Sequence, residues 1–164
     1  INVQNDGRLS LEQTYLDRLD YGIVGIHGIC YEDVGRKKNT QNLISCMQND
    51  KIRFVSHPDD GHMPLDYELL VPAAKEYHVA LEVNNSSLLR ADRLGCVQNY
   101  QDMLKLCDRL RVPIIVSSDA HDPDSVGRFD EARRLLSQMD FDEALILNTD
   151  VEKLFAHLAP SDVL

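Results

Sequence analysis

The fold is decided by the stretch Pro113-Ile114-Ile115-Val116-Ser117-Ser118-Asp119-Ala120-His121, an apolar run that ends in two ionisable side chains. Its β-branched residues predict a buried strand over residues 113–117. Short strands that are apolar on both faces are typical of parallel sheets covered by helices. Asp119 and His121 are therefore expected just beyond the carboxyl end of a strand.

The same apolar-then-polar pattern recurs along the chain and alternates with helical periodicity. We expect six strands, over residues 1–5, 21–26, 52–55, 79–83, 113–117 and 144–147. We expect six helices, over residues 10–19, 39–49, 66–77, 97–111, 128–138 and 151–157. This alternation indicates an α/β protein with a parallel sheet. No linker-like stretch divides it, so residues 1–164 are interpreted as a single domain.

Composition excludes several classes of function. The formal net charge of −10 works against sequence-independent binding of nucleic acid, which depends on Lys and Arg neutralising phosphates. No apolar run is long enough to cross a bilayer, so no membrane partner is expected. The 4 cysteines show no C-x-x-C spacing, which favours reduced thiols in a cytoplasmic protein.

Histidine and aspartate follow three of the predicted strands. His27 comes directly after strand 21–26, and His57 follows strand 52–55. Together with Asp119 and His121 they are expected on one rim, because the carboxyl ends of parallel strands form the active-site edge of such folds. Imidazole and carboxylate together are ligands for zinc, manganese or iron. A lone histidine at a strand end is usually structural, but this convergence favours a metal site.

Five segments carry a resemblance to a known family: Gly25-Ile26-His27, Val55-Ser56-His57-Pro58, Ala80-Leu81-Glu82-Val83-Asn84-Asn85-Ser86-Ser87, Ser117-Ser118-Asp119-Ala120-His121 and Ile146-Leu147-Asn148. In this order they resemble the motifs of the small stand-alone metal-dependent phosphatases of the PHP (polymerase and histidinol phosphatase) superfamily. The resemblance implies a distorted seven-stranded β/α barrel that binds up to three divalent metal ions. It also implies that small phosphomonoesters are hydrolysed through a metal-activated water.

The resemblance assigns roles to individual residues. His27 and His57 would bind one metal, Asp119 a second and His121 a third, with Asp119 and His121 as the catalytic residues. The family's opening His-x-His, two further histidines and a bridging Glu have no counterpart in this chain. We therefore expect a carboxy-terminal, incomplete barrel domain that lacks its amino-terminal strands. Its partners are expected to be a small phosphorylated substrate and either its own missing amino-terminal segment or a second copy.

Other polar residues allow two interpretations each. Arg90, Arg93 and Asn85 lie near the same rim and are candidate substrate-binding residues, although the arginines are also compatible with solvated charges. Glu82 would accept a hydrogen bond from a ligand histidine or pair with a buried cation. The Asp59-Asp60 pair is interpreted as solvated charge.

Two further functions remain as alternatives to a phosphatase. One is a polymerase-associated nuclease module of the same superfamily, against which the acidic charge counts. The other is a catalytically incomplete fragment that acts only in association. The fragment hypothesis concerns this polypeptide and the phosphatase hypothesis concerns the gene that encodes it, so these two are compatible.

Overall fold

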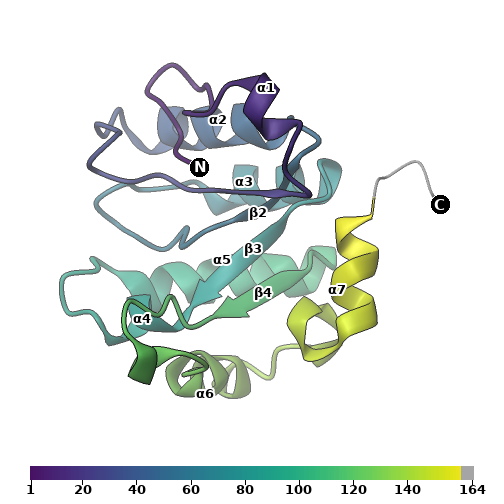
Figure 1. Cartoon of the computed structure of the whole chain (residues 1–164). Coiled ribbons are helices and arrows are strands. Elements are labelled where there is room, and N and C mark those ends of the chain that lie inside the picture. Colours follow the sequence, from purple (N-terminus) through teal and green to yellow (C-terminus); the bar gives the residue numbers. More distant parts are fainter. Residues whose placement is uncertain (160–164) are drawn as a thin grey trace.

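Four parallel strands form one sheet within residues 1–159, the range that the computed structural model describes (Figure 1). Their order in the sheet follows their order in the chain, β1 (Gly22–Val24), β2 (Ile52–Val55), β3 (Ala80–Asn84) and β4 (Ile114–Ser117). Each neighbouring pair is parallel, so the predicted α/β class is confirmed. The last five residues of the predicted 1–164 domain lie outside the described range.

Seven α-helices lie in the described part of the chain, and most match predicted ones. They are α1 (Gln13–Leu16), α2 (Arg36–Met47), α3 (Tyr67–Glu76), α4 (Asn85–Leu89), α5 (Cys96–Leu110), α6 (Asp130–Gln138) and α7 (Val151–Leu158). The predicted helix over 10–19 is reduced to the single turn Gln13–Leu16, and Glu12 at its start makes no side-chain capping bond. Helix α2 begins earlier than predicted, at Arg36. None of these described helices is long and apolar enough to span a membrane.

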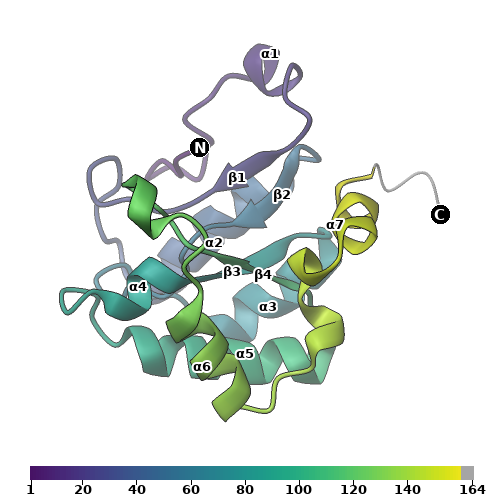
Figure 2. The same ribbon diagram turned by 60° about the horizontal axis from the view of Figure 1, so that its bottom comes forward.

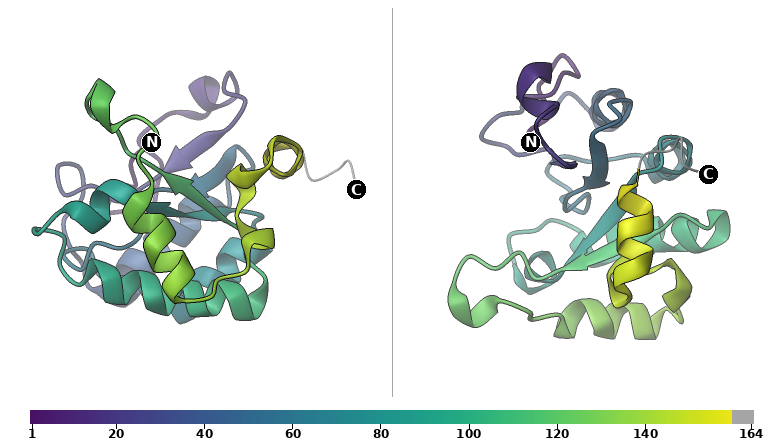
Figure 3. Two further views of the ribbon diagram at one scale, coloured as in Figure 1. Left: turned by 90° about the horizontal axis from the view of Figure 1, so that it is seen from below. Right: turned by 45° about the vertical axis from the view of Figure 1, so that its right-hand side comes forward.

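Alternating strand residues pack into two separate apolar clusters. The larger cluster takes Ile52, Val55 and Leu81 from the sheet and joins them to helices α2, α3 and α5. The smaller cluster takes Phe54 and Ala80 from the opposite face and joins them to α7. Figures 2 and 3 show α7, in yellow, at the end of the sheet opposite the strand arrowheads. The arrowheads of β3 and β4 point instead toward α4 (Figure 1), so the carboxyl edge is free of α7.

The prediction of regular strands over residues 1–5 and 144–147 is wrong. Residues 1–5 make only isolated bridges, of which Asn2 with Gly25 extends the sheet beside β1. The segment 144–147 forms parts of two 3-10 turns, and only Ile146 makes a bridge, to Ile114 of β4. The described residues form one sheet of four strands, so the seven-stranded barrel that the resemblance implies is not shown. The barrel stays a prediction for a longer chain.

A side chain replaces the missing strand at the edge of β4. The Asn148 amide donates to the Val116 carbonyl at 2.7 Å and accepts from the Val116 N–H at 3.0 Å. These are the two hydrogen bonds that a neighbouring strand would make with Val116. The outer edge of β4 is therefore partly covered at Val116, which limits pairing with another chain at this position.

We expect Asn148→Ala to lower the free energy of unfolding by about 1–3 kcal/mol, because it leaves two backbone groups of a half-buried strand without partners. Urea unfolding followed by circular dichroism measures the change, and light scattering measures any new self-association. Gln98→Ala is the matched control, since Gln98 makes one exposed hydrogen bond on α5. An Asn148→Ala protein that unfolds at the same urea concentration as the parent would contradict this role.

Candidate metal centre at the carboxyl edge of the sheet

His27 and His57 meet at the carboxyl edge, although 30 residues separate them in the chain. Their Nε2 atoms are 2.9 Å apart, and the two rings meet edge to face with centroids 4.7 Å apart. Two nitrogens bound to one tetrahedral zinc ion are about 3.4 Å apart, given Zn–N distances near 2.1 Å. The 2.9 Å separation is that of a direct N–H···N hydrogen bond between the two rings, so the rings would have to move apart by about 0.5 Å to bind one metal.

Gly25 permits this approach. A Cβ atom at residue 25 would overlap the Ser56 hydroxyl oxygen and would lie 3.1 Å from Cε1 of His27 and 3.5 Å from Cε1 of His57. The lack of a side chain at Gly25, directly after β1, therefore leaves space for the two imidazoles to come together.

The environment of both histidines disfavours their charged forms. Burial lowers the pKa of His27, and the neighbouring His57 lowers it further. Burial also lowers the pKa of His57, followed by the positive charge of Arg93, while Asp59 and Asp119 act in the opposite direction. Neutral imidazole is the form that binds a metal, so this environment is suited to ligands near neutral pH.

Glu82 of β3 holds the backbone of this edge in place. Its carboxylate accepts the His57 backbone N–H at 2.5 Å and the Ser117 hydroxyl at 2.5 Å. Burial raises the pKa of Glu82, and these hydrogen bonds act against that shift. Glu82 thus does accept a hydrogen bond from His57, but from its backbone N–H rather than its imidazole, and its other partners are the Ser117 hydroxyl and the Asn84 amide rather than a cation.

Asp119 and His121 lie beyond β4, with the His121 Nε2 3.5 Å from the Asp119 carboxylate. The chain turns at Asp119, which has a positive φ of 48°, so the segment is not extended. No backbone amide within residues 1–159 donates to Asp119, and the following turn is capped by Asp122. Asp119 therefore caps no turn within the described residues. The His121 side chain is 83% exposed, in contrast to the half-buried His27 and His57.

The donor set fits a metal only in part. The two imidazole nitrogens and the Asp119 carboxylate are suitable chemistry for zinc, manganese or iron. However, residues 1–159 contain no group of three or more His, Cys, Asp or Glu side chains placed to hold one ion. The structure therefore assembles two of the predicted ligands closely, and the metal-binding roles of all four stay predictions.

The three predicted substrate-binding residues differ in their surroundings. Arg93 is near the histidine pair and lies 3.5 Å from Asp60, whereas Arg90 is more exposed and pairs with Asp92 at 2.6 Å. Asn85 is buried, and its carbonyl oxygen accepts the Glu131 and Ala132 amides at the start of α6. That contact gives Asn85 a structural role, and the substrate-binding role of each residue stays untested.

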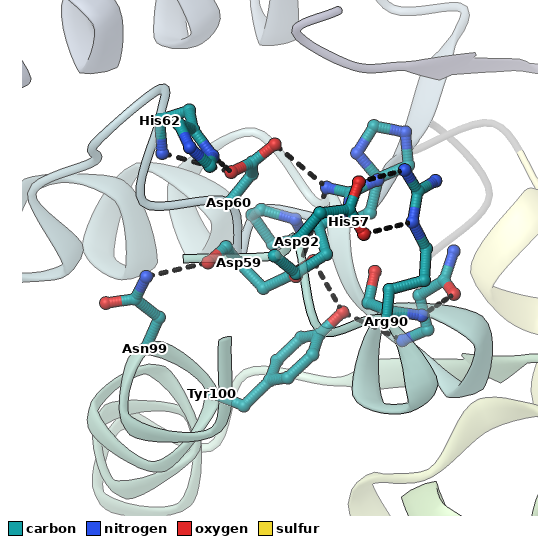
Figure 4. Close-up of polar contacts among 12 residues, drawn as sticks. His57, Asp59, Asp60, His62, Arg90, Asp92, Asn99 and Tyr100 are labelled. Atoms are coloured by element: carbon teal, nitrogen blue, oxygen red, sulfur yellow. Dashed lines mark hydrogen bonds and ion pairs between the residues drawn. The ribbon is translucent and has the colours of Figure 1, made fainter. Parts of the chain in front are cut away.

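Sequence reasoning missed a buried polar cluster behind His57 (Figure 4). Asp59 is fully buried rather than solvated, and its carboxylate accepts the Tyr100 hydroxyl at 2.8 Å. The same Tyr100 oxygen accepts the backbone N–H of Asn84 at 2.9 Å. A signal was present, because Tyr100 continues the buried stripe of Met103 and Leu104 by one helical turn.

Curated proteins named as probable phosphatases are similar to this chain over most of its length. One from Thermoanaerobacter sp. (strain X514) is 36% identical over 162 residues, which are 96% of this chain and 65% of that protein. One from Acetivibrio thermocellus is 34% identical over 151 residues, covering 92% of this chain and 62% of its own length. The chain thus spans less than two thirds of these relatives. No protein-family model matches it.

A solved structure shares the fold. A chain in the cryo-EM structure of archaeal Ribonuclease P with mature tRNA aligns with a TM-score of 0.62 at 17% sequence identity. The alignment covers 89% of this chain and 59% of the other. At this identity the similarity is evidence of the fold alone, which is consistent with the α/β class.

We expect Arg93→Gln to raise the pKa of His57, because it removes a nearby positive charge, while Arg90→Gln leaves that pKa nearly unchanged. Histidine NMR titration of the metal-free chain measures both. In the parent, the pKa values of His27 and His57 should lie below the ordinary value of about 6.5. The unfolded chain then takes up protons first, so the free energy of unfolding should fall as the pH drops below about 6.5. A His57 pKa above that value would contradict the described environment.

Proposed function

We propose that this chain is part of a metal-dependent phosphatase of the PHP type that hydrolyses small phosphomonoesters. The observation that carries the proposal is the 2.9 Å approach of the His27 and His57 Nε2 atoms at the carboxyl edge of a parallel sheet. The similarity to proteins named as probable phosphatases supports the same reaction class. The fold similarity at 17% identity gives no comparable support to the nuclease alternative.

In this proposal, His27 and His57 would hold one divalent metal, and Asp119 and His121 would hold neighbouring ions. Zinc is the first candidate, with manganese and iron as alternatives. A metal of this kind supplies hydroxide at neutral pH and neutralises charge on the phosphoryl oxygens. Glu82 contributes by fixing the His57 backbone, and Arg93 by placing a fixed positive charge beside the phosphoryl group.

The proposal includes ligands from outside residues 1–164. It is supported by the absence of a three-ligand group among the described residues and by the greater length of the relatives. An amino-terminal segment or a second copy would bring the remaining ligands to the same edge. We therefore expect this chain alone to bind metal weakly and to hydrolyse phosphomonoesters slowly.

His27→Gln should weaken zinc binding by the chain at least about tenfold, because removal of one of two adjacent ligands leaves a single imidazole. Isothermal titration calorimetry with zinc chloride at pH 7 measures the affinity. His78→Gln is the control, since His78 is an exposed histidine that precedes β3 at the opposite end of the sheet. Equal affinities in the parent and His27→Gln proteins would remove the metal-binding role of this pair.

Asp119→Asn should abolish most hydrolysis of p-nitrophenyl phosphate by the chain extended with the amino-terminal segment of a longer relative. The amide keeps the shape of the side chain and loses the anionic ligand, so the melting temperature should stay unchanged. The unextended chain is assayed in parallel with zinc or manganese. Full activity of the unextended chain would show that ligands from elsewhere are dispensable, and an unchanged rate for Asp119→Asn would remove the catalytic role of Asp119.

A further inference from the structure

The buried carboxylate of Asp59 has fewer partners than its burial demands. Its side chain is 0% exposed. One oxygen, Oδ1, accepts the Tyr100 hydroxyl, and the other, Oδ2, has no hydrogen-bond partner within the described chain. The nearest cation to Oδ2 is Arg93, whose guanidinium nitrogen is 4.0 Å away.

Stability alone does not explain a charged group at this position. Burying a carboxylate costs several kcal/mol, and the cost is repaid only when all its lone pairs are well satisfied. The hydrogen bond from Tyr100 needs only an oxygen acceptor, which the amide of Asn would also supply. What Asn could not supply is the negative charge that faces Arg93.

Arg93 itself is enclosed rather than free. Its side chain is only 12% exposed, and its guanidinium is close to two carboxylates, Asp60 at 3.5 Å and Asp59 at 4.0 Å. The positive charge of Arg93 reaches both His27 and His57, whose pKa values it lowers. A cation this close to a metal centre is repelled by bound metal ions, so an anchoring anion is needed to keep it there.

We propose that Asp59 is a positioning residue that holds the Arg93 guanidinium at the edge of the site, where it meets the phosphoryl group of the substrate. The inference rests on the proposed phosphatase function, because only that function places a phosphoryl group beside the histidine pair. Asp59 itself has no exposed surface and acts through Arg93. Asp60, at 3.5 Å from the same guanidinium, is the second anion beside Arg93 and stays in place when the charge of Asp59 is removed.

The backbone of the Asp59 loop is fixed independently of this charge. Asn99 donates to the Asp59 carbonyl at 2.6 Å, and Tyr67 donates to the Pro58 carbonyl at 2.7 Å. Helices α3 and α5 therefore hold the loop through neutral contacts, of which Figure 4 shows the one between Asn99 and Asp59. Removing the charge of Asp59 should accordingly leave the loop in place and release mainly the Arg93 side chain.

Two variants separate the charge of Asp59 from its contribution to packing. Asp59→Asn removes the charge and keeps an acceptor for Tyr100. Tyr100→Phe keeps the charge and removes a buried hydrogen bond, which destabilises the fold. The readout is the ¹⁵N order parameter of the Arg93 Nε–Hε group in the metal-free chain, assigned by comparison with Arg93→Lys.

We expect this order parameter to fall from about 0.85, typical of ordered groups, to below about 0.6 in Asp59→Asn, and to stay high in Tyr100→Phe. An unchanged order parameter in Asp59→Asn would overturn the proposal. Equal loosening in both variants would also overturn it, because the effect would then come from packing.

Inorganic phosphate tests the link to the substrate. Titration into the parent chain should shift the Arg93 Nε–Hε signal, and Asp59→Asn should weaken phosphate binding about fivefold, within the range of coupling between contacting residues. In an Arg93→Ala background, Asp59→Asn should have no further effect on affinity. An equal weakening in that background would overturn the proposal. Phosphate that leaves the Arg93 signal of the parent unshifted would instead contradict the proposed function, while the order-parameter result still decides the role of Asp59.

Discussion

The carboxylate of Glu82 joins the ends of three neighbouring strands. It belongs to β3, accepts the backbone N–H of His57 at the end of β2, and accepts the hydroxyl of Ser117 at the end of β4. His57 has a positive φ of 31°, which is an unfavourable conformation for a residue with a side chain. The hydrogen bond from His57 to Glu82 helps to hold that conformation, and with it the orientation of the imidazole toward His27.

The predictable part of the fold follows from local patterns. The apolar runs at 52–55 and 113–117 form strands at those positions, and Asp66 caps helix α3 as expected. The approach of His27 and His57 was also predictable, because parallel strands bring their carboxyl ends to a common edge. That inference needs only the alternation of strand and helix. It therefore holds even where the ends of single strands or helices are predicted wrongly.

The unpredicted part depends on contacts between distant residues. Residues 144–147 are apolar enough for a strand, but Asn148 satisfies Val116 with its side chain and the backbone turns away. Asp59 looks like half of a solvated acidic pair, and only the tertiary contact with Tyr100, 41 residues later, shows that it is buried. Asn85 likewise caps α6 across 46 residues. Sequence periodicity carries no information about such partners.

We propose above that His27 and His57, which follow two different strands, bind the same metal ion. Long-range ¹H–¹⁵N NMR spectra of the histidine rings, recorded during a zinc titration, test it most directly. We expect the Nε2 resonances of His27 and His57 to shift together, and the change in chemical shift to be complete at one equivalent of zinc. A shift of only one of the two, or an earlier shift of another histidine, would contradict it.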